Sequence, residues 1–173
     1  VRPALIFNPF SSLQVVTPPS THPEWLVPFG IELPKNKTDL AFMSIPELAS
    51  LIKYRKISCE DLTRFFIDRL KQYDSVLYCV TSFTEEHAIQ RARQADKELN
   101  NGIYRGILHG IPFGVKDLLA FPGYKTTWGA APYKDQIIDR EATVIEKLED
   151  AGAILIAKLS LGALAMGDIW YGG

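Results

Sequence analysis

The sequence predicts an α/β fold in which helices cover a mostly parallel or mixed β-sheet. From residue 44 onward, segments with apolar residues at helical spacing alternate with short apolar runs that are typical of strands. The last of these runs, residues 154–159, is almost continuously apolar, as in strands that are buried on both faces. The 173 residues are 47% apolar and 23% charged, a composition typical of a globular protein with a sizeable core.

Residues 1–38 are predicted to form a proline-rich arm that precedes the α/β region, residues 39–173. Prolines crowd residues 17–23 and recur at Pro28 and Pro34, and they interrupt regular structure because each lacks a backbone N–H. We expect the arm to lie as an extended strap on the surface of the domain. The residues expected to make this contact are Trp25, Leu26 and Phe29.

Two helices are predicted next. Residues 44–47, Ser-Ile-Pro-Glu, are typical of a capping box with proline in the first turn, so we expect a helix over about 44–55. Ser58 precedes two acidic residues and begins the second helix, which should end near Tyr73.

The rest of the chain continues the alternation. A β-branched and aromatic run predicts a strand over 77–83, and a charged segment predicts a helix over 84–99. The apolar stretch 109–120 predicts a second strand. The remaining predicted elements are a helix over 142–150, a strand over 154–159 and a short helix of small residues over 160–167. From residue 44 to 159 the expected order is therefore α-α-β-α-β-α-β.

One residue does not fit its surroundings. The stretch HGIPFGVKDLLA at 109–120 contains Lys116, although its neighbours predict a largely buried strand. Burying an ammonium group is costly. Either Lys116 lies at the end of the strand and reaches solvent, or the fold holds it in a cavity because its amine takes part in chemistry.

Several classes of site are not supported by the sequence. Cys59 and Cys79 form no CxxC pair, and the three histidines are scattered, so we expect no metal and no cofactor. Gly106, Gly110 and Gly114 recur every four residues, a spacing that matches neither dinucleotide-binding nor phosphate-binding loops. A net charge of −1 gives no basic surface, so no nucleic-acid partner is expected.

The sequence determines little about location. No apolar run approaches the roughly 20 residues that a membrane-spanning helix needs, so no membrane anchor is expected. A cytoplasmic location is the default expectation. The chain starts at Val1 rather than Met, which leaves export open.

Four sequence blocks resemble the amidase signature family. They are HGIPFGVKD at 109–117, GYKTTWG at 123–129, the segment 141–158, and LAMG at 164–167, in the order that the family has them. The resemblance is strong from about Asp39 onward. It implies a single α/β/α layered domain around a large mixed sheet, of which residues 39–173 would be the N-terminal part, truncated before the serine-rich loop.

The resemblance also implies a function. Such enzymes hydrolyse a carboxamide to a carboxylate and ammonia or an amine through a serine, a second serine joined by a cis peptide, and a lysine. Lys116 matches the catalytic lysine, which must be neutral to accept a proton, and we expect the apolar run to desolvate it. The two serines are expected downstream of Gly173, so this chain alone should be inactive. The implied partner is a small-molecule amide, and a homo-oligomer is left open.

We also predict roles for other polar residues and for residues that could line a substrate pocket. Asp117 is expected to orient local backbone or to pair with a neighbouring base. Lys158 is expected to extend outward or to pair with an acid, without a catalytic part. Met166 and Gly167 are expected to contact substrate. Thr126 and Thr127 are expected to stabilise a turn.

Two alternatives to a stand-alone amidase remain. One is the amidase subunit of a glutamine-dependent tRNA amidotransferase, and the other is a non-catalytic fragment or pseudoenzyme. The proline-rich arm and the apolar stretch 161–164 favour a stand-alone amidase, because the amidotransferase branch more often has polar residues there.

Overall fold

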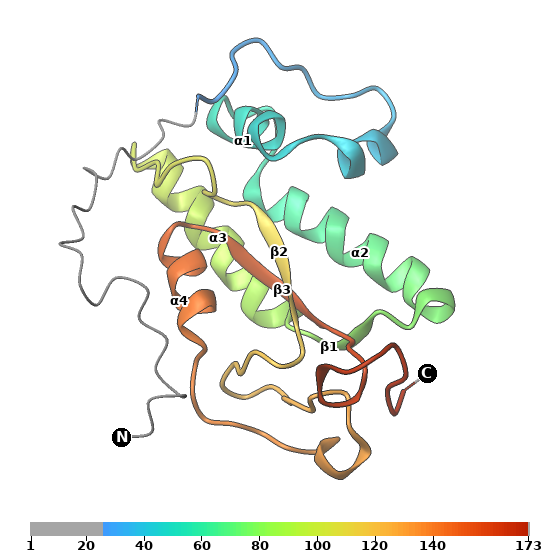
Figure 1. Cartoon of the computed structure of the whole chain (residues 1–173). Helices are drawn as coiled ribbons and strands as arrows, with labels where there is room; N and C mark the ends of the chain where they lie inside the picture. The colour runs from blue at the N-terminus through green and yellow to red at the C-terminus, as the bar shows by residue number, and fades with distance from the viewer. Residues whose placement is uncertain (1–25, 173) are drawn as a thin grey trace, which may run out of the picture.

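The structure is a computed structural model of the chain and describes residues 26–172. Its elements follow the predicted order (Figure 1). The helices are α1 (Ile45–Lys53), α2 (Cys59–Leu77), α3 (Glu85–Asn100) and α4 (Thr143–Asp150), and the strands are β1 (Val80–Phe83), β2 (Pro112–Lys116) and β3 (Ile154–Leu159). Short 3-10 helices span Lys37–Phe42, Ala131–Tyr133 and Ala163–Ala165. Within residues 26–172, none of the helices combines the length and the apolar character that crossing a membrane requires.

The sheet is mixed, as the sequence predicts. In the described part of the chain it has three strands in the order β1-β3-β2, with β1 antiparallel and β2 parallel to the central β3. Phe83 of β1 pairs with Ala157, and Lys116, the last residue of β2, pairs with Leu159. The parallel pair brings the carboxyl ends of β2 and β3 to the same edge of the sheet.

The helices cover both faces of β3. Side chains alternate along a strand, so Ile154 and Ile156 pack on one face in a core shared with α1, α2 and α3. Leu155 packs on the opposite face against Ile145 of α4 and Val115 of β2. This burial on both faces explains the almost continuous apolar run of β3, and it gives the three layers of an α/β/α arrangement.

The predicted starts of the first two helices are confirmed. At α1, the Ser44 backbone N–H donates to Glu47 Oε2 at 2.7 Å, which is part of the expected capping box. At α2, the Asp61 N–H donates to Ser58 Oγ at 2.9 Å. The predicted end of α2 near Tyr73 is wrong, because no glycine or proline interrupts the chain there and the helix continues to Leu77.

Three other predicted elements are shorter than expected. The strand predicted over 77–83 begins only at Val80, because α2 continues to Leu77. The strand predicted over 109–120 is limited to five residues, since residues 107–110 form a turn that ends at Gly110 with a φ of +77°. The helix predicted over 160–167 is wrong. Only Ala163–Ala165 forms a 3-10 turn, because Leu164 is left-handed and its N–H donates to a neighbouring loop rather than along a helix.

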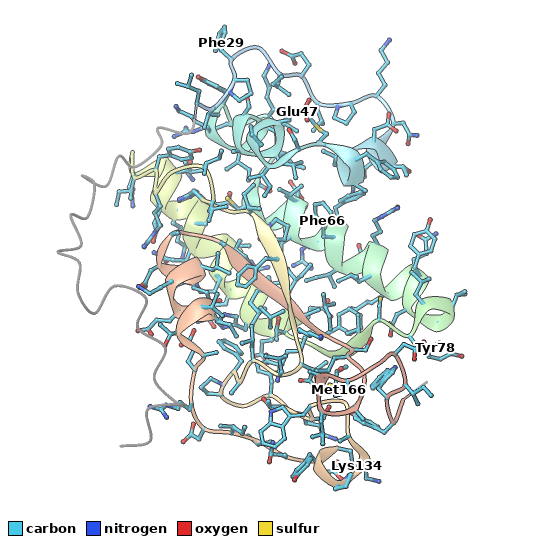
Figure 2. All side chains as sticks on the ribbon, in the orientation of Figure 1. Phe29, Glu47, Phe66, Tyr78, Lys134 and Met166 are labelled. Carbon is cyan, nitrogen blue, oxygen red and sulfur yellow. The ribbon has the colours of Figure 1, made fainter. Side chains whose placement is uncertain are left out.

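The described part of the arm lies against α1. Ser50 Oγ of α1 donates to the Pro28 carbonyl at 2.6 Å, and Val27 and Ile31 pack on the core. The expected contact through Leu26 is wrong, since it is 84% exposed. Phe29 is equally exposed, and Figure 2 shows it at the outer edge of the molecule, but its ring meets that of Tyr54 edge-on at the end of α1, with 5.2 Å between the ring centroids. Trp25 and the prolines of residues 17–23 lie outside the described residues.

Candidate active site

A cleft opens at the carboxyl ends of β2 and β3. Its volume is about 400 Å³, and Lys116 lies in its wall at the end of β2. The carboxyl edge of parallel strands is where ligands commonly bind in open α/β sheets. The other lining residues come from the end of α2 and from the segment after β3, and they are Leu77, Tyr78, Ser160, Leu161, Gly162, Gly167, Asp168 and Trp170.

Lys116 is exposed, so the expectation that this apolar run desolvates its amine is wrong for the described chain. The reason is the two-residue period of the strand. Val115 points into the core and is buried, and Lys116 therefore points away from the core at the point where β2 ends. The first of the two alternatives raised by the sequence, a lysine at a strand end that reaches solvent, is the one that the structure has.

The buried lysine is Lys158 instead. Its side chain is fully buried in β3, and its Nζ lies 2.7 Å from Asp117 Oδ1. The Nζ also donates to Thr126 Oγ1 at 2.7 Å and to the Lys125 carbonyl. The expected pairing with an acid is confirmed, whereas the expected outward extension is wrong. Burial lowers the pKa of Lys158, and the adjacent Asp117 carboxylate opposes that shift.

Asp117 has both of the roles expected for it. Its Oδ2 accepts from the Thr127 N–H at 2.9 Å and from Thr127 Oγ1 at 2.5 Å. Its own backbone N–H donates to the Leu159 carbonyl at 2.8 Å, and its carbonyl accepts from the Trp128 N–H at 3.2 Å. Asp117 therefore pairs with a base and also orients the backbone where β2 becomes a loop.

Thr126 and Thr127 do more than stabilise a turn. Both are fully buried and supply hydroxyl partners to the two buried charges. Sequence reasoning misses this role, although a signal is present. Asp117 and Lys158 follow or end neighbouring apolar strands, and two opposite charges so placed need polar partners, which a Thr-Thr pair can provide.

The loop 125–129 also holds the wall of the cleft that the segment after β3 forms. The Leu164 N–H donates to the Trp128 carbonyl at 2.7 Å, and the Tyr171 N–H donates to the Gly129 carbonyl at 3.3 Å. Gly129 has a φ of +67°, and a Cβ there would lie 2.1 Å from the Leu161 carbonyl oxygen. The wall therefore packs directly on the loop backbone, at a position that requires glycine.

The two residues expected to contact substrate differ in position. Gly167 lines the cleft together with Lys116. Met166 is 77% exposed and is not among the lining residues of the described cleft. Figure 2 shows Met166 in the segment that follows β3. Substrate contact by either residue stays a prediction.

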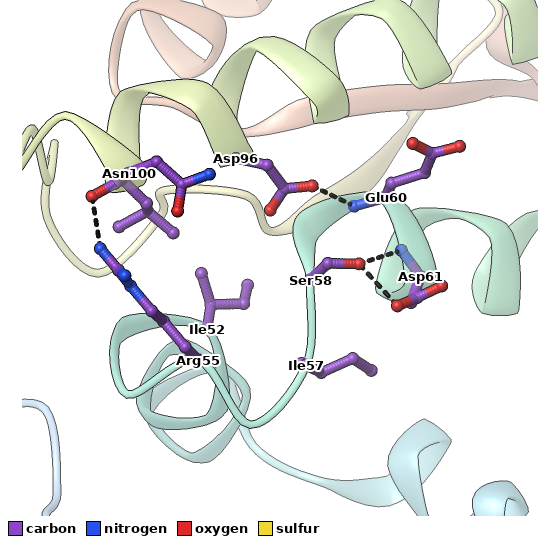
Figure 3. A pocket seen from close by; sticks show the side chains of 9 residues that line it. Ile52, Arg55, Ile57, Ser58, Glu60, Asp61, Asp96 and Asn100 are labelled. Carbon is purple, nitrogen blue, oxygen red and sulfur yellow. Dashed lines mark hydrogen bonds between the residues drawn. The ribbon is translucent and has the colours of Figure 1, made fainter.

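A second concavity lies where α1, the start of α2 and α3 meet, and its polar residues hold these helices together. Asp96 of α3 accepts from the Glu60 N–H at 3.1 Å (Figure 3) and also from the Cys59 N–H at 2.7 Å, and so caps α2. Arg55 donates to the Leu99 carbonyl at 2.9 Å. Because these polar groups satisfy one another, we do not assign a site here.

The described residues contain no group of three or more His, Cys, Asp or Glu side chains that could hold a metal. His109 is buried, with Nε2 3.0 Å from the Ala95 carbonyl and Nδ1 3.3 Å from the Arg105 backbone nitrogen. Burial raises the pKa of the Cys59 thiol, which keeps it in the unreactive neutral form. His109 and Cys59 therefore have structural roles, while His22 lies outside the described residues.

Solved structures define the class of protein to which this arrangement belongs. The peptide amidase of Stenotrophomonas maltophilia aligns with a TM-score of 0.66 and 26% identity, over 71% of this chain and 26% of that one. An amidase family protein of Bacillus anthracis aligns with a TM-score of 0.66 and 28% identity, over 73% of this chain and 26% of that one. The fold is thus that of the amidase-signature enzymes, represented by part of the domain.

The sequence comparison assigns the family. The Amidase family profile matches residues 61–168, and the chain belongs to this family. A curated relative, a glutamyl-tRNA(Gln) amidotransferase subunit of Thermoanaerobacter pseudethanolicus, is 35% identical over 130 residues, or 75% of this chain and 26% of the relative. The corresponding subunit of Pseudomonas aeruginosa is 35% identical over 126 residues, or 73% of this chain and 26% of the relative. The chain spans about a quarter of the length of these relatives.

Proposed function

We propose that the protein carrying this chain is an amidase that hydrolyses a carboxamide to a carboxylate and ammonia or an amine. The observation that carries the proposal is the position of Lys116. It is the last residue of β2, it lines the cleft at the carboxyl edge of the sheet, and it lies within the matched family region.

In the proposed mechanism, a serine attacks the amide carbonyl and Lys116 accepts its proton through a second serine. The amine leaves, and water then releases the acyl group from the nucleophilic serine. Ser160 lines the cleft but does not match the family's nucleophile, so we assign both serines to another part of the polypeptide. The relatives are about three times as long as this chain, which supports that assignment.

The neutral form of Lys116 needs surroundings that this chain does not supply, since the residue is exposed here. We propose that the remainder of the amidase domain covers the cleft and removes water from the amine. On this view the isolated chain contributes the base and part of the scaffold, and it is inactive by itself.

The test compares three proteins for ammonia release from a simple primary amide: the full-length protein, its Lys116→Ala variant and this chain alone. We expect turnover by the full-length protein, a fall of about 100- to 10,000-fold in kcat/KM for Lys116→Ala, and no turnover by the chain alone. Lys134→Ala, which removes an exposed lysine outside the cleft, is the control and should retain activity. Undiminished turnover by Lys116→Ala would refute the role of the lysine.

A second candidate function is favoured by the curated relatives. Both of those described above are amidotransferase subunits, and in this candidate the chain belongs to a subunit that releases ammonia from glutamine within a larger assembly. Copurification with partner subunits, and ammonia release from glutamine only in their presence, would favour this candidate. Absence of turnover on any amide, with or without partners, would favour a non-catalytic fragment or pseudoenzyme.

A further inference from the structure

Four buried polar residues gather at the end of β2, where the candidate base lies. We call Asp117, Lys158, Thr126 and Thr127 the buried charge cluster, and each of them is fully buried. The cluster joins three segments: Asp117 follows β2, Lys158 belongs to β3, and the two threonines lie in the loop 125–129. Figure 1 shows the segments after β2 and after β3 at the same end of the sheet.

Burying this cluster is energetically unfavourable compared with filling the same space with apolar side chains. Taking two charges out of water is costly, and proteins with apolar residues of similar volume in place of a buried ion pair are often equally stable or more stable. Here the charges have a close ion pair of 2.7 Å and several hydrogen-bond partners, so the arrangement has a defined geometry. Such a pair supplies directionality that apolar packing would not.

On one side, the cluster is connected to Lys116 through the backbone. Asp117 is the next residue in the chain, and its N–H donates to the Leu159 carbonyl at 2.8 Å. Lys116 itself pairs with Leu159 across the parallel strands. The backbone of Lys116 is therefore held on one side by its pairing with β3 and on the other by Asp117, whose carboxylate anchors the loop 125–129.

On the other side, the cluster is connected through the loop 125–129 to the segment after β3 that lines the cleft. Asp117 Oδ2 accepts two hydrogen bonds from Thr127, and the next two residues of the loop accept the Leu164 and Tyr171 N–H groups. Residues 161–170 include five that line the cleft with Lys116. One buried cluster is thus bonded both to the backbone next to the candidate base and to the loop that holds the other lining segment of the cleft.

We propose that Asp117 and Lys158 are positioning residues, which hold Lys116 at a fixed place relative to the wall formed by residues 161–171. Neither side chain touches the cleft, and both act through the backbone of Lys116 and the loop 125–129. The part of the inference that concerns kcat rests on the proposed amidase function. The structural part, the fixing of the wall, is independent of activity.

The variant Asp117→Asn keeps the shape of the side chain and removes its charge. In the full-length protein we expect kcat to fall about 10- to 100-fold with KM within about twofold, because a small displacement of the base affects the proton transfer. We also expect the Leu164 and Tyr171 amides, which hold the wall, to exchange hydrogen at least about tenfold faster, while the amides of α2 keep their wild-type rates. Thr127→Val, which removes only one hydroxyl, tests the same cluster with a milder change should Asp117→Asn fail to fold.

The control is Glu98→Gln. It removes one charge from the Glu98–Arg105 ion pair, whose atoms lie 2.6 Å apart and whose residues are not among those lining the cleft. This variant should leave both kcat and the exchange of the wall amides unchanged. The double variant Asp117→Asn/Lys158→Met should lose no more activity than Asp117→Asn alone, because the uncompensated ammonium is absent.

The outcomes are distinguishable. Unchanged exchange at Leu164 and Tyr171 in folded Asp117→Asn overturns the positioning role, and so does faster exchange with unchanged kcat. If the wild-type protein hydrolyses no amide, the proposed function fails. In that case the exchange measurement alone still decides whether the cluster holds the wall.

Discussion

Lys158 and Lys116 lie one position apart across the parallel strands, and the structure gives them opposite environments. Lys158 pairs in register with Val115, the residue before Lys116, and it is fully buried with its Nζ 2.7 Å from Asp117 Oδ1. Lys116 is exposed and lines the cleft. The burial that the sequence suggests for the candidate base is found at the second lysine, where polar partners surround the amine.

The first prediction concerns the stability that depends on this pair. Lys158→Ala leaves the fully buried Asp117 carboxylate without its base, so we expect the free energy of unfolding to fall by about 3–5 kcal/mol. Lys158→Met/Asp117→Asn removes both charges and should recover part of that loss. Urea denaturation of the full-length protein measures both values, and an equal loss in the two variants would contradict the explanation.

The second prediction compares two glycines with similar backbone angles. Gly129 has a φ of +67° and would place a Cβ 2.1 Å from the Leu161 carbonyl, whereas Gly123 has a φ of +80° with no atom within 4 Å. Gly123→Ala should cost only the backbone strain, about 1–2 kcal/mol. Gly129→Ala adds a collision with backbone, and it should cost more and displace the wall of the cleft. Thermal unfolding of both variants checks the difference, and equal losses would argue against the close approach.

The third prediction concerns acid stability. Hydrogen bonds from the Arg105 guanidinium lower the pKa of Glu98 to about 2, whereas an unfolded glutamate titrates near its usual value of about 4.3. Because the folded pKa is depressed, the stabilisation is complete above the unfolded value and is lost as the pH falls from about 4.3 toward 2. Glu98→Gln should therefore flatten the decline of unfolding free energy in this range. A decline identical to that of the wild type would show that other carboxylates account for it.

The sequence predicts most of the fold because its local signals agree with the tertiary packing. The capping box at Ser44 and the apolar run over 154–159 locate α1 and β3 closely. The predicted elements are wrong where tertiary contacts, rather than local sequence, determine the backbone conformation. The segment 160–167 has helix-forming composition, but its backbone bonds to the loop 125–129 instead.

The candidate site could be predicted only in part. Lys116 is found through its motif, while its exposure depends on which face of β2 meets the core. The buried charge cluster escapes prediction because its members are separated by up to 41 residues in sequence, counted from Asp117 to Lys158, and come together only when β2 and β3 pair. Lys158 by itself gives no sign of which acid it will meet.

The last prediction concerns the two cysteines, which are free in the described residues. Burial raises the pKa of both thiols, but Cys59 is fully buried at the start of α2 whereas Cys79 is partly accessible before β1. Only the thiolate reacts with iodoacetamide, and the reagent must also reach it. At pH 8 we expect Cys79 to be alkylated slowly and Cys59 to stay unmodified until the protein unfolds, as mass spectrometry of the digested protein would show. Alkylation of Cys59 at the same rate as Cys79 in the native protein would mean that the contact between α2 and α3, where Asp96 caps the helix, opens readily.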